Sequence, residues 1–234
     1  MTDGKEEKRE RVREIASEHY KRGDVLGWFD ALYKEAAGDN EVIPWADLEP
    51  NRYFRRWAEE NGLKGNGERA LVVGCGLGDD AAYLDDLGFD VTAFDISSTA
   101  IEWAKKLYAD RNIKFEVMDL FQPFRGWTCG QAGSLRSGGF DFVLEVYTIQ
   151  PLPIEMRQKT MDAIAAFVAP GGCLVVVTRG RGDDEEVDEL PWPISRKELA
   201  WFQDAGLEEK SFVVYPSDEE DEPERFIVEY SRPN

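Results

Sequence analysis

Hydrophobic residues follow two different periods along the chain. From Arg69 onward, short runs of β-branched and other apolar residues alternate with stretches in which polar and apolar positions mix at helical spacing. Runs of this length, separated by helical segments, are typical of parallel strands that are buried on both faces. The pattern therefore predicts an α/β fold around a mostly parallel sheet. The five apolar runs are Ala70–Val73, Val91–Phe94, Ile113–Val117, Phe140–Leu144 and Cys173–Thr178.

The order of elements changes near the C-terminus. After a helical stretch near residues 195–205, two strand-like runs, Ser211–Tyr215 and Arg225–Tyr230, follow each other with no helix between them. Consecutive strands without a crossover helix pair as a hairpin. We therefore expect a doubly wound sheet of about seven strands with one antiparallel strand. Capping boxes are expected at Thr99–Glu102 and Ser195–Glu198, where two helices begin.

The first 66 residues precede the alternating pattern. Residues 1–22 are highly charged and predict an exposed helix, and a second helix is expected around Asn51–Asn61. The stretch between these two helices is rich in aromatic residues. We expect residues 1–66 to form an N-terminal helical extension that acts as a lid, and residues 67–234 to form the main domain.

Composition and charge narrow the functional classes. The 234 residues include 28 Lys and Arg against 47 Asp and Glu, a net charge of −19, and 42% of them are hydrophobic. A strongly acidic protein repels phosphate backbones, so a small molecule is a better partner than a nucleic acid. No apolar run approaches the about 20 residues of a membrane span.

Cysteine usage and the N-terminus indicate the compartment. Cys75, Cys129 and Cys173 are too widely separated for a disulfide framework or a zinc site, so we expect no metal. The segment Met1–Arg13 is charged and lacks the apolar stretch of a secretory signal. These features predict a cytoplasmic protein, either a monomer or a homodimer, that does not bind membranes.

A glycine-rich turn follows the first apolar run of the predicted sheet. Gly74, Gly76 and Gly78 allow backbone angles that a Cβ forbids and let a ligand approach the backbone closely. The dinucleotide-binding turn has the spacing G-x-G-x-x-G and places a pyrophosphate at the helix N-terminus. Here the spacing is G-x-G-x-G, and Asp79 and Asp80 would repel a pyrophosphate at that position. The turn therefore favours a cationic nucleotide-like ligand over NAD or FAD.

Acidic residues follow the next two predicted strands. Asp95 comes about 20 residues after Gly74, where a carboxylate can accept hydrogen bonds from both hydroxyls of a ribose. Asp119 follows the third strand and can accept from an adenine amino group, while Leu120 or Phe121 packs against the ring. The carboxyl ends of parallel strands share one edge of the sheet, so these groups predict a site for an adenosine-containing ligand.

Together these motifs resemble those of the class I S-adenosylmethionine-dependent methyltransferases, over roughly Ala70 to Phe212. The resemblance implies a Rossmann-like fold, S-adenosylmethionine as the cofactor and a small-molecule methyl acceptor. It also implies that the glycine turn contacts the methionine part of the cofactor, that Asp95 binds its ribose and that Asp119 binds its adenine. The candidate cofactor-binding residues are Trp45, Gly74, Cys75, Gly76, Gly78, Asp80, Asp95, Ile96, Asp119, Leu120, Phe121 and Glu145.

Within this family, the chain is similar to the thiol, thiopurine and halide methyltransferase branch. The resemblance implies a thiol or another soft nucleophile as the acceptor. The chain departs from the branch at Val73 and Ile154, where the branch usually has proline. The similar segments are Ile43–Trp45, Gly74–Gly76, Asp95–Ser97 and Leu152–Arg157.

Methyl transfer from a sulfonium is an in-line displacement that needs mainly positioning and the exclusion of water, so no general base is obligatory. If the acceptor is an amine or a hydroxyl, Glu145 or Tyr147, near the end of the fourth predicted strand, is the candidate base. Glu145 is also a candidate ligand for the cofactor's ammonium group. Trp28 and Tyr33 from the N-terminal segment, and Trp192 from the loop after the fifth strand, are the candidate substrate-contacting residues.

Two alternatives from other functional classes remain. One is a Rossmann-type nucleotide-binding oxidoreductase, which binding of a nicotinamide cofactor would support. The other is a cofactor-binding protein without catalysis, which would bind S-adenosylmethionine but turn over no acceptor.

Overall fold

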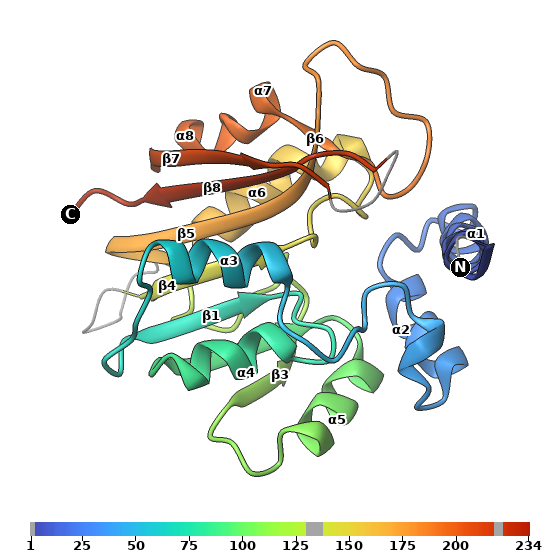
Figure 1. The fold of residues 1–234 in the computed structure, drawn as a ribbon, viewed down its shortest axis with the longest axis horizontal. Helices are drawn as coiled ribbons and strands as arrows, with labels where there is room; N and C mark the ends of the chain where they lie inside the picture. Colours follow the sequence, from blue (N-terminus) through green and yellow to red (C-terminus); the bar gives the residue numbers. More distant parts are fainter. Residues whose placement is uncertain (1–2, 130–137, 218–221) are drawn as a thin grey trace.

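A central sheet runs through the computed structural model, which describes residues 3–129, 138–217 and 222–234 (Figure 1). The strand order is β3-β2-β1-β4-β5-β8-β7, and a short strand, β6, pairs with β5. The order of the strands reverses direction between β1 and β4, which is the switch point of a doubly wound sheet. The strands are β1 (Arg69–Val73), β2 (Asp90–Asp95), β3 (Lys114–Val117), β4 (Phe140–Val146), β5 (Val168–Arg181), β6 (Ile194–Ser195), β7 (Glu208–Tyr215) and β8 (Arg225–Ser231).

Strand directions confirm the predicted topology. β1 pairs in parallel with β2 and β4, β3 pairs in parallel with β2, and β5 pairs in parallel with β4. β8 is antiparallel to both β5 and β7, so it is the one reversed strand of the seven-strand path. β7 and β8 are the expected C-terminal hairpin, and part of their connection, residues 218–221, lies outside the described residues.

Successive side chains of each strand point to opposite faces of the sheet, and both faces are buried. Leu71 and Val73 belong to the hydrophobic cluster that includes residues of α6 and α8, whereas Ala70 and Val72 belong to the cluster that includes residues of α3, α4 and α5. Helices therefore cover both faces of the sheet, as buried parallel strands require. The helices on one face are α3 (Arg52–Glu60), α4 (Asp79–Asp86) and α5 (Ser98–Leu107), and those on the other are α6 (Arg157–Ala165), α7 (Arg196–Leu199) and α8 (Trp201–Asp204), with η2 (Ile154–Met156) just before α6.

The N-terminal helices α1 (Asp3–Tyr20) and α2 (Gly27–Ala36) pack together at one end of the sheet, followed by η1 (Asn40–Val42) (Figure 1). Asp30 of α2 accepts hydrogen bonds from Ser97 Oγ at 2.8 Å and from the Thr99 backbone N–H at 3.0 Å. Burial by itself would raise the pKa of Asp30, but hydrogen bonds from Lys34, Thr99 and Ser97 outweigh this effect and lower the pKa. This ionised side chain ties α2 to the start of α5.

The predicted division at residue 66 remains a prediction. α3 lies inside the N-terminal segment, yet its residues Phe54 and Trp57 are buried in the cluster on one face of the sheet. Packing of this kind joins part of the proposed extension to the main core.

One of the two predicted capping boxes forms. The Ser195 side chain accepts from the Glu198 backbone N–H, and the Glu198 side chain accepts from the Ser195 backbone N–H. The prediction at Thr99–Glu102 is wrong, because Ser97 is the N-cap of α5 and its side chain accepts from the Ala100 N–H. The Thr99 N–H bonds instead to Asp30, a long-range contact that the local sequence does not reveal.

Candidate active site

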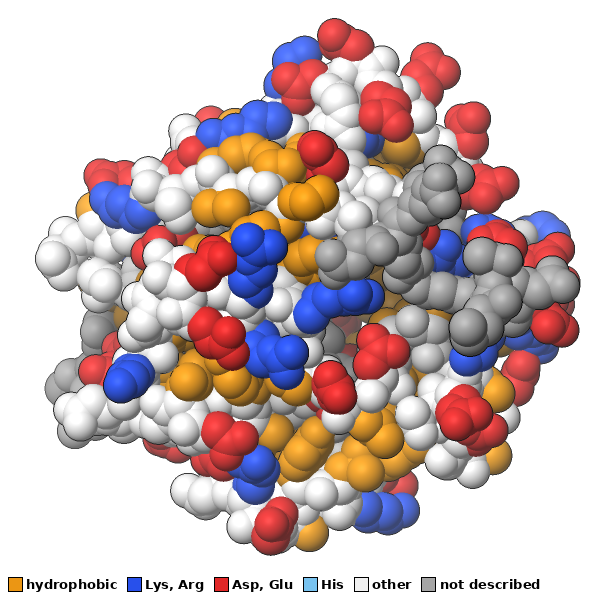
Figure 2. Space-filling view, in the orientation of Figure 1, with side chains coloured by type: hydrophobic (Ala, Val, Ile, Leu, Met, Phe, Trp, Pro, Cys, Tyr) orange, Lys and Arg blue, Asp and Glu red, His pale blue; other side chains and the backbone are white. Residues whose placement is uncertain are grey.

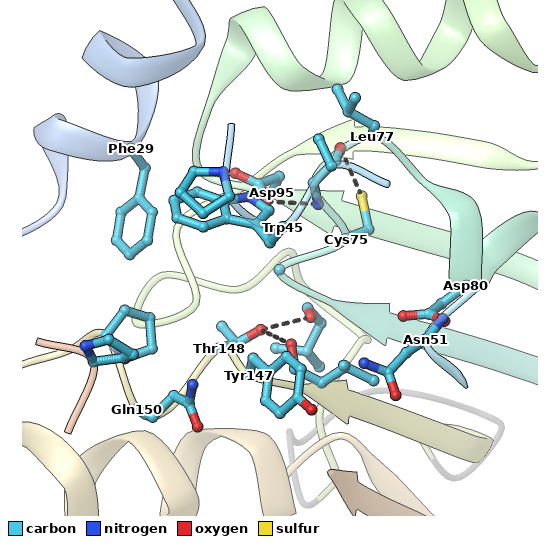
Figure 3. Close-up of a pocket in the computed structure, with 18 of the residues that line it drawn as sticks. Phe29, Trp45, Asn51, Cys75, Leu77, Asp80, Asp95, Tyr147, Thr148 and Gln150 are labelled. Atoms are coloured by element: carbon cyan, nitrogen blue, oxygen red, sulfur yellow. Dashed lines mark hydrogen bonds between the residues drawn. The ribbon is translucent and has the colours of Figure 1, made fainter. Parts of the chain in front are cut away.

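A cavity of about 640 Å³ opens where the parallel strands end. Its lining comes from the turn after β1, from the ends of β2 to β5, from the start of β8 and from the N-terminal segment (Figure 3). Open α/β sheets bind ligands in the crevice at this edge, next to the switch point. The volume lies within the range of small-molecule sites.

The glycine turn presents bare backbone to the cavity. The Gly76 N–H donates to Asp95 Oδ2 at 2.9 Å, and Gly76 has a φ of +52°. A Cβ at Gly76 would lie 2.9 Å from the Tyr33 hydroxyl, and one at Gly74, whose φ is +59°, would lie 2.5 Å from the Thr148 side chain. Both positions therefore require glycine for conformation and for space.

Asp95 and Asp119 stand at the ends of neighbouring strands. Asp95 Oδ1 accepts from the Ser97 N–H at 2.8 Å, so each oxygen of this carboxylate has one backbone donor. Burial raises the pKa of Asp95. Asp119 accepts from the Phe121 N–H and from Gln122 Nε2, both at 2.8 Å. Because a carboxylate has about four acceptor positions, both side chains retain capacity for a ligand.

Two more carboxyl groups begin α4 beside the glycine turn. Asp80 Oδ1 accepts from the Asn51 N–H at 2.8 Å, and burial raises the pKa of Asp80 to about 7. Asp79 accepts from the Tyr108 hydroxyl at 2.5 Å, and burial raises its pKa as well. A cation in the cavity would favour the charged forms of these groups. Of the carboxyl groups that line the cavity, we call Asp79, Asp80, Asp95 and Asp119 the acidic wall.

Aromatic residues of the N-terminal segment cover the cavity. The Trp45 indole N–H donates to the Tyr33 hydroxyl at 2.9 Å, and the two rings meet edge to face. Trp28 is fully buried and packs against Trp45. Trp45 is 40% exposed, so it borders solvent as well as the cavity.

Glu145 lies apart from the cavity. Its side chain is fully buried, it is not among the lining residues, and Oε1 accepts from the backbone N–H groups of Thr148 at 2.5 Å and Ile149 at 3.1 Å. Burial raises the pKa of Glu145 to about 8. In this position the side chain holds the turn after β4 and does not present a carboxylate to a ligand.

Tyr147 does line the cavity. It has a φ of +58°, which is rare for a non-glycine residue and is a form of backbone strain that clusters at functional sites. Arg225 Nε donates to the Tyr147 hydroxyl at 3.0 Å, yet burial outweighs this charge and raises the pKa of Tyr147. The side chain is therefore a neutral hydrogen-bond donor near pH 7, not a ready base.

Two other predicted site residues lie outside the lining. Trp192 stacks on Tyr20 with ring centroids 6.3 Å apart, while Leu190 and Pro191 of the same loop reach the cavity instead. Gly78 lies next to Phe115, whose ring would be 2.7 Å from an added Cβ, so its small size serves the packing of α4 against β3. The other predicted residues do line the cavity, namely Trp28, Tyr33, Trp45, Gly74, Cys75, Gly76, Asp80, Asp95, Ile96, Asp119, Leu120, Phe121 and Tyr147.

Several lining residues were not predicted from the sequence. Thr148 and Gln150 come shortly after β4, so the rule that led to Tyr147 would have found them if it had been extended by a few positions. Arg179 lies on β5 two residues after Val177, where the pairing with β4 ends, whereas Arg225 begins β8 and reaches this edge only because β8 runs in the opposite direction. Asn51 lines the cavity as the N-cap of α3, where its side chain accepts from two backbone N–H groups.

The polar groups that line the cavity fit a cationic adenosyl ligand. Bare backbone, two strand-end carboxylates and further acids at the start of α4 match a ribose, an adenine amino group and a positive charge. Cys75 lines the same turn, and burial raises the pKa of its thiol well above the ordinary value, so it is not a ready nucleophile.

Residues 3–129, 138–217 and 222–234 include no group of three or more His, Cys, Asp or Glu side chains arranged to hold a metal ion. Within them, no helix combines the length and apolar character that crossing a membrane requires.

Comparison with known proteins reveals related methyltransferases. The chain is 26% identical over 176 residues to a 2-heptyl-1-hydroxyquinolin-4(1H)-one methyltransferase of Mycobacteroides abscessus, covering 73% of this chain and 72% of that protein. The N-methyltransferase NodS of Bradyrhizobium japonicum WM9, solved with S-adenosyl-L-homocysteine, matches with a TM-score of 0.63 and 18% identity, over 88% of this chain and 98% of that chain. A 1,6-didemethyltoxoflavin-N1-methyltransferase of Burkholderia thailandensis matches with a TM-score of 0.63 and 14% identity, over 87% and 88%.

The two solved structures share the fold of this protein at low sequence identity. A family model described as a methyltransferase domain matches residues 45–209, which include the glycine turn and both strand-end acids. Since this match spans more than half of the chain, the protein belongs to the methyltransferase domain family and is a methyltransferase with a Rossmann-like fold.

Proposed function

We propose that this protein transfers a methyl group from S-adenosylmethionine to a small molecule bound in the cavity beside the acidic wall. The observation that carries the proposal is the meeting of Gly76, Asp95 and Asp119, from the ends of three successive strands, around one cavity. Separate clefts for these residues would have removed the basis for a cofactor site.

The cofactor is held by its polar groups. Asp95 accepts hydrogen bonds from the ribose hydroxyls, Asp119 accepts from the adenine amino group, and the backbone of the glycine turn contacts the methionine part. The acidic wall stabilises the positive charge of the ligand. When bound, S-adenosylmethionine supplies an electrophilic methyl group on a cationic sulfur.

The chain's own residues position the acceptor and exclude water. Trp28, Tyr33 and Trp45 cover the cavity from the N-terminal side. Positioning an acceptor atom about 3–3.5 Å from the reacting carbon contributes about 7–11 kcal/mol to lowering a barrier of this type. The N-terminal helices are therefore part of the catalytic machinery of the proposed reaction.

The methyl acceptor must already be nucleophilic when it binds. Glu145 is buried behind the lining and Tyr147 is neutral, so neither side chain is ready to remove a proton. A thiol ionises without help, and the resemblance to the thiol, thiopurine and halide branch supports this acceptor class. The relative from Mycobacteroides abscessus is named for a 1-hydroxyquinolin-4(1H)-one, and an acidic hydroxyl of that kind satisfies the same condition.

Calorimetry and a kinetic pH profile test the proposal. We expect S-adenosylhomocysteine to bind with a micromolar dissociation constant, and S-adenosylmethionine to methylate members of a thiol panel. For each thiol the rate should follow the ionisation of that thiol, because no protein base takes part. Absence of binding at high micromolar concentration would exclude the cofactor, and a common protein-controlled pKa across the panel would contradict the mechanism.

A further inference from the structure

Positive side chains form a second wall of the cavity. Of the arginines that line it, we call Arg9 of α1, Arg179 of β5 and Arg225 of β8 the arginine wall. Figure 2 shows Lys and Arg side chains over α3 in the face in view, whereas the side chains of Arg179 and Arg225 are largely buried. Figure 3 shows Tyr147, which bonds to Arg225, across the pocket from Asp95.

The sheet register places two of these cations side by side. Arg179 and Arg225 are direct partners in the antiparallel pairing of β5 with β8. Direct cross-strand partners project from the same face, and like charges at such positions destabilise the pair. The Arg179 and Arg225 side chains are only 19% and 6% exposed, so water screens their repulsion poorly. An arrangement of this kind requires negative charge close by.

One buried carboxylate partly meets that requirement. Glu222, 9% exposed, lies 3.2 Å from Arg179 Nη1, 3.4 Å from Arg225 Nη2 and 2.5 Å from Arg9 Nη1. Within the described residues, no other carboxylate lies within ion-pair distance of Arg179 or Arg225, and Arg9 also approaches only the exposed Glu6, at 3.9 Å. Three guanidinium groups thus share one buried negative charge.

Donor groups of the arginine wall remain available to a ligand. The Arg179 guanidinium makes its one contact, among the residues described, through Nη1, although a guanidinium carries five N–H donors. The Tyr147 hydroxyl accepts from Arg225 Nε, so its own proton can be donated to another acceptor. An anionic oxygen group would accept from both residues and neutralise the remaining charge.

We propose that the methyl acceptor is an anion, and that Arg179 and Arg225 bind its carboxylate or ionised hydroxyl while Tyr147 donates to the same group. This inference rests on the proposed methyltransferase function. The apolar lining residues Phe29 and Leu190 suit an aromatic or aliphatic body attached to that group. The cofactor also carries a carboxylate, so the test must separate the two sources of this chemistry.

Matched acid and amide pairs provide the test. The probes are 2-mercaptobenzoate with 2-mercaptobenzamide, 4-hydroxybenzoate with 4-hydroxybenzamide, and octanoate with octanamide, titrated into the full-length protein with and without saturating S-adenosylhomocysteine. We expect at least one acid to bind the wild type about tenfold or more tightly than its amide, because charge-assisted bonds are the stronger kind. R179Q and R225Q should each remove this preference and leave S-adenosylhomocysteine affinity within about twofold.

Two further variants distinguish loss of the anion site from general misfolding. E222Q frees the arginines from their shared carboxylate and should tighten binding of the acid, a direction that general loss of structure cannot produce. R125Q removes an exposed arginine outside the lining and should change neither the acid preference nor the cofactor affinity.

The other outcomes overturn the inference, assign the arginines to the cofactor or refute the proposed methyltransferase function. The inference is overturned if no acid is preferred by the wild type, or if the preference survives in both R179Q and R225Q. Loss of S-adenosylhomocysteine affinity by about tenfold in these variants, with the acid preference intact, would assign the arginines to the carboxylate of the cofactor. A wild type that prefers acids but does not bind S-adenosylhomocysteine would retain the anion site and refute the proposed methyltransferase function.

Discussion

The two walls of the cavity are built in different ways. Each carboxyl group of the acidic wall lies at a strand end or helix start, and Asp95 and Asp119 accept bonds from residues a few positions away or from the neighbouring turn. The arginine wall depends on the pairing of β5 with β8 and on a helix from the other end of the chain. Strand ends and a helix start therefore place the negative groups, and the pairing of distant strands places the positive groups.

The contrast also bears on how ligands reach the site. The protein carries a net charge of −19, so its long-range field attracts a cationic cofactor and opposes an anionic acceptor. Salt at physiological strength screens this field beyond about 8 Å. A compact arginine wall inside the cavity acts within that distance, so an anion can be bound locally by a protein that repels it at long range.

The largest effect is expected at the acidic wall. Asp95→Ala should weaken S-adenosylhomocysteine binding by about 100-fold or more, because two charge-assisted bonds contribute about 1.5–3 kcal/mol each and 1.4 kcal/mol is tenfold. Calorimetry measures this, and the acid preference of the arginine wall should persist. Asp90→Ala, at the exposed opposite end of β2, is the matched control. A change of less than about threefold would remove the ribose role from Asp95.

A smaller effect is expected at the glycine turn. Gly76→Ala forces a Cβ to within 2.9 Å of the Tyr33 hydroxyl at a φ of +52°, and left-handed backbone costs about 1–2 kcal/mol for a non-glycine residue. S-Adenosylhomocysteine affinity should fall about tenfold, and part of it should return in a Tyr33→Phe background, which lacks the crowding oxygen.

Gly62→Ala separates crowding from backbone strain. Gly62 has a φ of +63° with nothing within 4 Å of an added Cβ, and it lies outside the cavity. This variant should lower the melting temperature but leave cofactor affinity unchanged. Equal losses of affinity in the Gly62 and Gly76 variants would mean that the close contact with Tyr33 is irrelevant.

The smallest effect is expected on the pH dependence of stability, at Glu145, which is fully buried outside the lining of the cavity. Its pKa is about 8 in the folded protein against an ordinary 4.5, so between these values the folded state keeps a proton that the unfolded state has lost. Wild-type stability should therefore fall relative to Glu145→Gln as pH rises through this window. Gln can still accept from Thr148 and Ile149 through its oxygen.

Melting curves at pH 5 and pH 9 measure this difference. From pH 5 to pH 9 we expect the stability of the variant to rise by at least about 1.4 kcal/mol relative to wild type, or about 3–6 °C in melting temperature, because one pKa unit corresponds to that energy. Glu102→Gln, an exposed change, should show no such pH dependence. Abolished methyl transfer in a stably folded Glu145→Gln protein would restore Glu145 as the catalytic base.

Local patterns in the sequence were sufficient to predict the sheet and most of the cofactor side of the cavity. Alternating apolar runs led to the strands, and the residues directly after them led to Gly76, Asp95 and Asp119. These predictions held because the carboxyl ends of parallel strands always meet at one edge of a sheet. Whether Asp95 and Asp119 bind ribose and adenine stays a prediction until cofactor binding is measured.

Other features depend on contacts that local patterns do not contain. Trp192 lies beside Tyr20, outside the lining, because its loop packs against α1. The Thr99 N–H bonds to Asp30 of α2, and Ser97 instead of Thr99 is the N-cap of α5. Glu145 follows the strand-end rule but lies outside the lining, because its buried carboxylate accepts from the backbone N–H groups of Thr148 and Ile149.

The sequence by itself determined a doubly wound sheet with a glycine turn after the first strand and acids after the next two, because each of these depends on residues that are close neighbours along the chain. Only the tertiary structure decided that Arg179 and Arg225 lie together in the same cavity. Their pairing depends on the direction and register of β8 against β5, and a shift of one residue would send the Arg225 side chain to the other face of the sheet.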